Sequence, residues 1–425
     1  MTQAAELSGA RALPHRFLVL ALLFLVYTFN FIDRQILGIL AGPIQEELGL
    51  TDTQLGWLGG PAFAIFYSVV GVPIALYADR ANRTWIMTIA LSAWSAFTAL
   101  CAFAGSFMQL FLARIGVGVG EAGGVAPSYS LIADYFPKHE RARALAVFSF
   151  GVPVGSAAGI ALGGIVASMV DWRAAFITVG LLGLVLAPIF RLIVREPPRG
   201  GMDAVAKAEA PPSFFQVFAM LGRRRAFWLM SFGAASSSIM GYGLLFWTPS
   251  FLRRSFDFSL QEAAYFYAAI LLIGGVAGCW LGGAIADKMG QKSRKAYPFV
   301  PAISFFITTP LVIFATLTTS PIIAFIALMG VTAFATAWLG PVIAAMQHFV
   351  GPHMRTTASA CFLFINNIVG IGLGSLVIGV LSDALAQRFA EESLRYSILA
   401  GAAFYFLAAL LMLTATRFVE RDWQE

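Results

Sequence analysis

The chain has 425 residues, of which 59% are hydrophobic and only 12% are charged. Soluble proteins carry about 25% charged residues, so this composition excludes an ordinary soluble domain and predicts a polytopic membrane protein. Three cysteines in apolar runs and four histidines without ligand spacing predict neither a disulfide framework nor a metal site, and the net charge of +6 is not a nucleic-acid signal.

Apolar runs of roughly 20 residues, the length that crosses a bilayer as a helix, predict twelve transmembrane helices. The first run is too long for a cleavable signal peptide and contains two charges, Asp33 and Arg34. The predicted helices cover residues 17–41, 54–77, 84–104, 107–133, 144–169, 174–194, 227–251, 262–285, 297–318, 321–347, 357–382 and 395–417.

The basic residues predict the orientation. Of the 28 Lys and Arg residues, 21 fall on the side of the N-terminus, five fall on the opposite side, and Arg34 and Arg114 lie inside the membrane. Basic residues concentrate on the cytoplasmic side of membrane proteins, so both termini are predicted to be cytoplasmic. We expect a monomer in the bacterial inner (plasma) membrane.

The chain repeats itself across a polar stretch at mid-chain. Residues 48–51 match residues 256–259 at an offset of 208, and Pro127 matches Pro341 at an offset of 214. Duplicated six-helix halves around a midplane site are typical of secondary transporters. We therefore predict an all-α membrane protein with two pseudo-symmetric six-helix bundles. The expected parts are a first bundle 1–194, a cytoplasmic linker 195–226 and a second bundle 227–425.

Two local patterns add detail to this plan. The linker contains Ser213, a plausible helix cap, before a phenylalanine-rich stretch with a basic end, which predicts a short helix on the membrane surface; a plain linker is the alternative. The fifth predicted helix carries a glycine every four residues, a stripe that permits close helix contact. The stripe consists of Gly151, Gly155, Gly159 and Gly163.

Four charges inside apolar segments are the strongest functional signal. A charge at the centre of a membrane helix costs ~2.5–3.5 kcal/mol, so such side chains face a partner or a watery cavity. Arg114 and Glu121 are seven residues apart and lie on one helix face, with Gly118 between them. The other two charges are Asp33 and Arg34.

The second half lacks these charges, because the repeat places uncharged residues at all four positions. This asymmetry favours a role in chemistry over one in architecture, although buried structural ion pairs remain the alternative. The four counterparts are Gly241, Tyr242, Leu328 and Ala335.

Two loops at matching positions of the repeat carry an aspartate among basic residues. Residues 79–83 (Asp-Arg-Ala-Asn-Arg) and 287–292 (Asp-Lys-Met-Gly-Gln-Lys) resemble the cytoplasmic loop motif of the major facilitator superfamily. Each aspartate can lie at the positive N-terminal end of a helix in the other half, which would close a cytoplasmic gate. The alternative is a pair of basic loops that set topology. The predicted gate residues are Asp79, Arg80, Arg83, Asp287, Lys288 and Lys292.

Part of the first half also resembles the spinster family. The resemblance rests on residues 27–34 (Tyr-Thr-Phe-Asn-Phe-Ile-Asp-Arg), on the loop 79–83, on residues 118–122 (Gly-Val-Gly-Glu-Ala) and on residues 133–136 (Ala-Asp-Tyr-Phe). It implies a proton-driven transporter of lysolipids or sphingoid phosphates. Asp33 and Glu121 match the acidic positions of the family, and Arg34 and Arg114 match its basic positions.

We therefore hypothesise alternating access with proton coupling. Asp33 is expected to pair with Arg114 and Glu121 with Arg34, the reverse pairing being the alternative. Protonation of one acid would release its arginine to hold an anionic headgroup. Five polar residues are candidate cavity contacts or, alternatively, hydrogen bonds between helices. They are Tyr27, Asn30, Thr336, Asn366 and Asn367.

Other functions remain open at this point. A small organic anion or a drug-like amphipath would also suit two arginines, and a channel or a membrane-embedded lipid enzyme are further classes. No Ser-His or metal constellation lies mid-membrane, which argues against an enzyme. We expect no catalytic residue, metal or cofactor. The expected partners are the lipid bilayer, protons and a small amphipathic or anionic substrate, with no nucleic acid.

Overall fold

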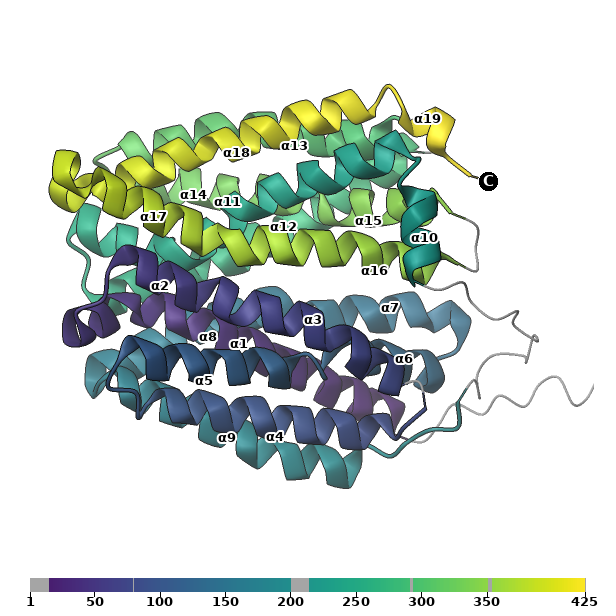
Figure 1. The fold of residues 1–425 in the computed structure, drawn as a ribbon, viewed down its shortest axis with the longest axis horizontal. Coiled ribbons are helices and arrows are strands. Elements are labelled where there is room, and N and C mark those ends of the chain that lie inside the picture. Colours follow the sequence, from purple (N-terminus) through teal and green to yellow (C-terminus); the bar gives the residue numbers. More distant parts are fainter. Residues whose placement is uncertain (1–14, 79, 200–213, 291–292, 351–353, 425) are drawn as a thin grey trace, which may run out of the picture.

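The computed structural model describes residues 15–78, 80–199, 214–290, 293–350 and 354–424. All regular elements in these ranges are helices, as the apolar runs predicted, and they form two bundles that lie one above the other in Figure 1. The first bundle contains α1 (Arg16–Leu48), α2 (Asp52–Gly59), α3 (Pro61–Ala78), α4 (Arg83–Cys101), α5 (Phe107–Glu121), α6 (Val125–Tyr135), α7 (Lys138–Ser149), α8 (Gly151–Met169) and α9 (Trp172–Ile193).

The second bundle follows after the short α10 (Phe214–Leu221). It contains α11 (Arg225–Phe256), α12 (Leu260–Gly290), α13 (Ala296–Leu317), α14 (Pro321–Thr336), α15 (Leu339–Gln347), α16 (Arg355–Asn366), the π-helical turn η3 (Asn367–Ile371), α17 (Gly372–Phe389), the 3₁₀ turn η4 (Ala390–Glu392), α18 (Ser393–Ala415) and α19 (Val419–Asp422).

Each predicted transmembrane segment contains helix, although several are divided. Within the described residues, ten stretches are long and apolar enough to cross a membrane, and the last of them, Thr357–Ala415, holds two predicted segments. The predicted segment 107–133 is not among the ten, because a turn at 122–124 separates α5 from α6. Two adjacent glycines, Gly123 and Gly124, lie in this turn, and glycine is a weak helix former.

The predicted glycine stripe joins α8 to α1. A Cβ atom on Gly159 would come within 2.7 Å of the main-chain oxygen of Ile32, and one on Gly155 would meet the main-chain oxygen of Thr28. The absence of side chains on this face lets the two backbones touch, as small residues do at membrane helix interfaces. The stripe therefore fixes the position of α1, which carries Asp33 and Arg34.

The internal repeat is visible in the turns that follow α1 and α11. Both helices end at a residue in the left-handed region, Gly49 (φ 62°) and Asp257 (φ 55°), 208 positions apart. The next helices begin with an N-cap hydroxyl, Thr51 and Ser259, that accepts a hydrogen bond from the backbone three residues on. The two halves thus build the same turn with different residues.

The linker contributes the helix α10 and a segment that is hydrogen-bonded to the first bundle. Helix α10 lies at the end of the molecule where the chain terminates (Figure 1), and two of its side chains, Val217 and Leu221, are fully buried. The cap predicted at Ser213 lies outside the described residues. Before that gap, Tyr135 donates a hydrogen bond to the main-chain oxygen of Arg195 at 2.6 Å, which holds the start of the linker against α6.

Candidate functional site

A buried ion pair joins α1 to α5 inside the first bundle. Arg34 Nε donates to Glu121 Oε2 at 2.8 Å, and the Glu121 side chain is completely buried. Of the pairings that the sequence left open, this is the one expected for these two residues. It forms because both residues lie on the helix faces that α1 and α5 turn toward each other.

Aromatic rings surround the Arg34 guanidinium. Its carbon lies 5.0 Å from the ring centroid of Phe31, 4.7 Å from that of Phe63 and 4.8 Å from that of Tyr67, within the range of cation–π attraction. One of its nitrogens, Nη2, has no hydrogen-bond partner among the described residues. The guanidinium therefore keeps the capacity to donate to a further anion.

The second expected pair is not formed. Arg114 Nη1 donates to the main-chain oxygen of Asp33 at 3.5 Å, and within the described residues no ion pair joins Arg114 to the Asp33 carboxylate. Neighbouring helix residues point about 100° apart, so when Arg34 faces α5, Asp33 is turned toward α4. There its carboxylate faces Thr98 and Trp94. Both Asp33 and Arg114 are almost fully buried.

Gly118 brings a third helix to this site. A Cβ atom at Gly118 would come within 2.7 Å of the main-chain oxygen of Phe63 on α3. The close approach of α3 places the Phe63 ring beside both guanidinium groups, 4.7 Å from Arg34 and 5.8 Å from Arg114. The glycine between the two charges on α5 thus permits the close packing of α3 against this site.

The second bundle contributes a residue that sequence reasoning named only as an uncharged repeat counterpart and not as part of the site. Tyr242 on α11 packs against the core of the first bundle and lies near Arg34, as does Tyr67 on α3. Tyr242 is the counterpart of Arg34 in the repeat, and this relation is the signal that would have found it. The two counterparts meet near the axis that relates the two halves.

The other candidate contacts differ in what they touch. Tyr27 stacks on Phe148, with ring centroids 4.3 Å apart, and Asn30 faces Glu121. In the second bundle, Thr336 donates to the main-chain oxygen of Thr332 in its own helix at 2.9 Å.

The two adjacent asparagines lie where α16 ends and η3 begins. Asn366 accepts from Ser238 at 2.9 Å and so joins α16 to α11. Asn367 begins η3, a turn of a type that frequently marks functional places in helices.

Only part of the predicted loop gate is described. Asp79 and Lys292 lie outside the described residues, as does the side chain of Asp287. Arg80 and Lys288 are exposed.

Arg83 is bound within its own half. It is 1% exposed and forms ion pairs with Asp134 at 2.5 Å and with Glu196 at 2.6 Å. Arg83 therefore joins the start of α4 to α6 and to the linker.

At the opposite end of the bundle, charged groups join the two halves. Arg254 on α11 contacts both carboxylate oxygens of Asp52 on α2 at 2.7 Å, the bidentate geometry of a strong pair. Asp52 is 5% exposed and also accepts from Ser382 on α17 at 2.6 Å. Asp383 accepts from the backbone N–H of Thr53 at 2.8 Å and so caps α2 from the other half.

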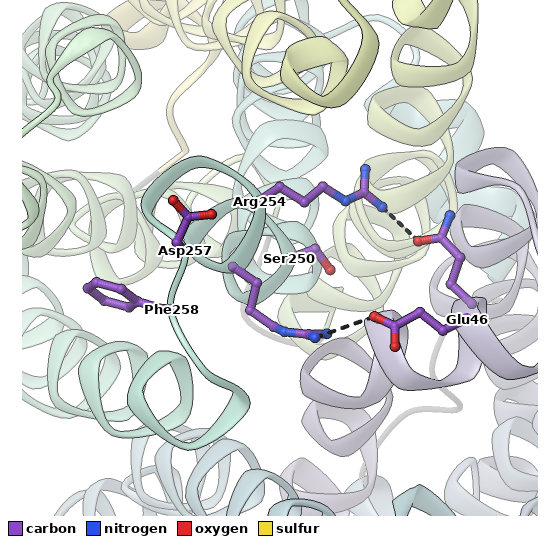
Figure 2. A pocket seen from close by; sticks show the side chains of 8 residues that line it. Glu46, Ser250, Arg254, Asp257 and Phe258 are labelled. Carbon is purple, nitrogen blue, oxygen red and sulfur yellow. Dashed lines mark hydrogen bonds and ion pairs between the residues drawn. The ribbon is translucent and has the colours of Figure 1, made fainter.

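A cavity of about 280 Å³ lies beside this network, at the crossing of α1 and α11. Figure 2 shows two contacts across it, from Arg254 to Gln45 at 2.7 Å and from Arg253 to Glu46 at 3.4 Å. Arg253 is the repeat counterpart of Gln45, and Arg254 is the repeat counterpart of Glu46. The internal symmetry therefore relates the Arg254–Gln45 contact to the Arg253–Glu46 contact. Sequence reasoning counted the two arginines among the five basic residues of the non-cytoplasmic side and did not name Gln45 or Glu46.

A duplicated helical bundle with charges buried inside one half, and with the two halves joined across one end, defines a secondary membrane transporter. The sequence pattern of the Major Facilitator Superfamily matches residues 23–375, and the chain belongs to this superfamily and to its spinster-like transporters. Its relatives and its fold are those of transporters and not of enzymes.

The similar proteins support the same assignment. An MFS-type efflux pump of Mycolicibacterium smegmatis is 32% identical over 94% of this chain and 92% of its own length. Protein spinster homolog 1 of Homo sapiens is 28% identical over 95% of this chain and 81% of its own length.

A solved structure is also similar along nearly the whole chain. A bacterial homolog of the human lysosomal transporter spinster, in an inward-facing and unoccupied conformation, matches with a TM-score of 0.88 and 33% identity, over 97% of this chain and 99% of that chain. An inward-facing, occupied form matches with a TM-score of 0.86 and 31% identity, over the same shares.

Proposed function

We propose that the protein is a proton-coupled carrier that moves an anionic amphiphile, such as a lysolipid or a sphingoid phosphate, by alternating access. The observation that carries this proposal is the buried Arg34–Glu121 pair, whose guanidinium keeps one unbound nitrogen inside a shell of aromatic rings. An arginine in this setting suits a phosphate or carboxylate group, which accepts two parallel hydrogen bonds.

The proton acts by changing the charge that Arg34 experiences. While Glu121 is ionised, the pair is neutral and the guanidinium is held. Once Glu121 takes up a proton, Arg34 is left as an unpaired cation in a low-dielectric site and binds an anionic headgroup instead. Loss of the proton on the other side of the membrane restores the pair and displaces the substrate.

The energy available from protons is sufficient for uphill transport. One proton that crosses roughly 100 mV supplies ~2.3 kcal/mol. A gradient of one pH unit adds ~1.4 kcal/mol. Together they support a substrate gradient of roughly 500-fold for each proton transported.

In this proposal the two bundles, 1–194 and 227–425, rock about the linker 195–226. The Asp52–Arg254 network serves as the gate of the non-cytoplasmic end, and the loops at 79–83 and 287–292 serve as the cytoplasmic gate. The similarity to inward-facing structures supports the assignment of the joined end to the outer side. We further propose a monomer in the bacterial inner membrane with both termini in the cytoplasm, which the distribution of basic residues supports.

A drug-like amphipath is a second candidate substrate. The mycobacterial relative is named an efflux pump, and aromatic shells of the kind around Arg34 accept varied apolar bodies. A small organic anion would use the arginine without the aromatic surface. An acyl-chain series separates these possibilities, because only an amphiphile carrier gains affinity with chain length.

The experiment is uptake of a labelled anionic lysophospholipid into proteoliposomes, with and without an imposed pH gradient. We expect the gradient to stimulate uptake and Glu121→Gln to abolish the stimulation. Glu392→Gln, which removes a surface partner of Arg395 in the second bundle, is the matched control and should behave like the wild type. Equal wild-type uptake at all gradients would refute proton coupling, and recovery of altered lipid would refute a carrier.

A further inference from the structure

Five arginines form a basic corner at the end of the second bundle where the chain terminates. Three of them follow α10 directly, and two lie in or just before α19, at the same end of the molecule (Figure 1). The two segments touch, because the Arg225 guanidinium lies 5.5 Å from the ring centroid of Phe418 and the backbone N–H of Ala226 donates to Asp422 at 2.8 Å. The basic corner consists of Arg223, Arg224, Arg225, Arg417 and Arg421.

The protein does not neutralise the charge of this corner. Within the described residues none of the five arginines forms an ion pair, and four of them are exposed. The two acids of α19 have other partners: Glu420 pairs with Lys295 at 3.4 Å, and Asp422 is 4% exposed and accepts a hydrogen bond from the start of α11. Clustered unpaired positive charges attract an anionic partner.

A row of aromatic rings leads away from the basic corner along α11. The ring centroids of Phe218 on α10 and Trp228 lie 5.5 Å apart, and those of Trp228 and Phe232 lie 5.8 Å apart. Phe232 is 47% exposed. Seven residues separate it from Arg225, so the two side chains lie on one helix face, about 10 Å apart along the axis. Phe218, Trp228 and Phe232 are called the aromatic row below.

A membrane surface has the same order of layers. Charged headgroups cover the hydrocarbon core, and tryptophan is enriched at the boundary between them. Helix α11 is one of the stretches long and apolar enough to cross a membrane, so its first residues meet the headgroups and Phe232 reaches the hydrocarbon. A soluble acidic partner would contact the arginines and leave the aromatic row uncovered.

Helix α10 itself is not the part that enters the lipid. Its side chains Val217 and Leu221 are fully buried, and the helix packs on α16. Its apolar face is therefore used inside the protein, and the junction between α10 and α11 is left to meet the membrane.

We propose that the basic corner and the aromatic row bind an anionic phospholipid, with the phosphate among the arginines and the acyl chains along Trp228 and Phe232. The planar arginine side chain suits a phosphate, which accepts two parallel hydrogen bonds from it. This lipid stays bound at the membrane surface and differs from the transported amphiphile at Arg34. Its place in the cytoplasmic leaflet rests on the topology proposed above, whereas its binding does not depend on proton coupling.

Native mass spectrometry of the purified protein tests the lipid class. The protein is mixed with equal amounts of phosphatidylglycerol and phosphatidylethanolamine that carry the same acyl chains. We expect about tenfold more bound phosphatidylglycerol, with a preference that falls as salt is added. Equal binding of the two lipids would overturn the proposal.

A double variant locates the site. Arg223→Gln/Arg421→Gln removes one exposed arginine from each segment of the basic corner, and phosphatidylglycerol should bind roughly thirtyfold more weakly, since each basic residue near an anionic surface contributes about fivefold. Arg143→Gln/Arg195→Gln is the matched control, because it removes the same charge from two exposed positions of the first bundle and the start of the linker. An equal loss in the control would overturn the site.

A soluble headgroup separates a lipid site from a phosphate site. Glycerol phosphate has the charge of the headgroup but no acyl chains, so at the concentration of the lipid it should leave the bound phosphatidylglycerol in place. Displacement at equal concentration would show that the arginines bind free phosphate groups, and the lipid assignment would fail.

These measurements use no gradient and so separate this inference from the proposed function. If the Arg223→Gln/Arg421→Gln variant loses phosphatidylglycerol while wild-type uptake ignores the pH gradient, the lipid site stands and proton coupling fails. If uptake follows the gradient but this variant binds phosphatidylglycerol like the wild type, proton coupling stands and the lipid site fails.

Discussion

Two buried ion pairs of the molecule connect different parts of it. Arg34 and Glu121 belong to one bundle and are enclosed by it, whereas Arg254 and Asp52 belong to different bundles and are held at one end. A pair inside one bundle can change its protonation while the bundle stays intact. A pair between bundles has to break whenever its end opens. Under the proposed function, the Arg34–Glu121 pair therefore responds to protonation, and the Asp52–Arg254 pair resists separation of the two bundles.

Removal of Arg34, which breaks the enclosed pair, should cause the largest loss of uptake and of stability. Arg34→Leu leaves the fully buried Glu121 carboxylate without its partner, which costs about 3–5 kcal/mol when a buried pair is broken. We expect lost uptake and a lower unfolding temperature, measured in proteoliposomes and by thermal unfolding.

The double variant Arg34→Leu/Glu121→Gln separates stability from transport. It removes the unpaired charge, so the unfolding temperature should recover while uptake stays absent. If the double variant is as unstable as Arg34→Leu, the loss comes from packing of the Arg34 side chain and not from charge. The charge of the enclosed Arg34–Glu121 pair would then have no measurable role in stability.

Loss of the Asp52–Arg254 pair, which bridges the two bundles, should change the conformation of the protein more than its stability. Asp52→Asn removes the charge that Arg254 contacts at 2.7 Å, and we expect the open population of this end to rise about tenfold, equal to ~1.4 kcal/mol. Spin labels at the exposed Met169 and Glu391, one in each bundle, would report the separation by electron–electron resonance.

The control lies at the same end of the molecule. Glu47 pairs with Arg173 inside the first bundle, so Glu47→Gln should leave the label distances unchanged. The repeat sharpens the test, because it places the apolar Leu260 where the first half has Asp52. The second half therefore has no carboxylate at the position equivalent to Asp52. Equal label distances in Asp52→Asn and the wild type would show that the Asp52–Arg254 ion pair is not needed to hold this end closed.

The packing that supports the enclosed pair should respond to one methyl group. A Cβ atom on Gly118 would come within 2.7 Å of the Phe63 main-chain oxygen, so Gly118→Ala should destabilise the protein by ~1–3 kcal/mol, the usual cost of overpacking. Gly71→Ala on α3 meets only one atom, at 4.0 Å, and is the control. Unfolding temperatures measure both, and equal values would exclude a packing role for Gly118.

Hydrophobic runs and repeat offsets were sufficient to predict the fold, because both can be read from the sequence without knowledge of how the helices pack. The runs located the helical segments, the glycine spacing located the stripe on α8, and the charges inside apolar segments gave the Arg34–Glu121 pair as the expected one of two possible pairings. They did not reveal that Asp33 turns to α4, because rotation about a helix axis depends on the packing of neighbouring helices. That rotation places Thr98 beside the carboxylate, a residue with no distinctive sequence pattern.

The network between the bundles was missed for a related reason. Asp52 reads as an ordinary residue after the helix-cap threonine, and Arg254 reads as a basic residue at a helix end. Their contact depends on how two halves dock, which no periodicity within either half records. The repeat did contain the information that α1 and α11 end alike, as Gly49 and Asp257 show. The repeat could not reveal that Asp52 and Arg254 would form an ion pair between the two halves.

The smallest expected effects concern the second bundle, which shares the plan of the first but not its charges. Tyr242 lies near Arg34, whereas the Thr336 hydroxyl bonds its own helix at 2.9 Å. Tyr242→Phe should therefore raise the substrate KM about threefold to tenfold, the loss of one hydrogen bond worth ~0.5–1.5 kcal/mol. Thr336→Val should change KM less than about twofold, because no contact with substrate is lost. A larger effect for Thr336→Val than for Tyr242→Phe would move the substrate contact of this bundle from α11 to α14.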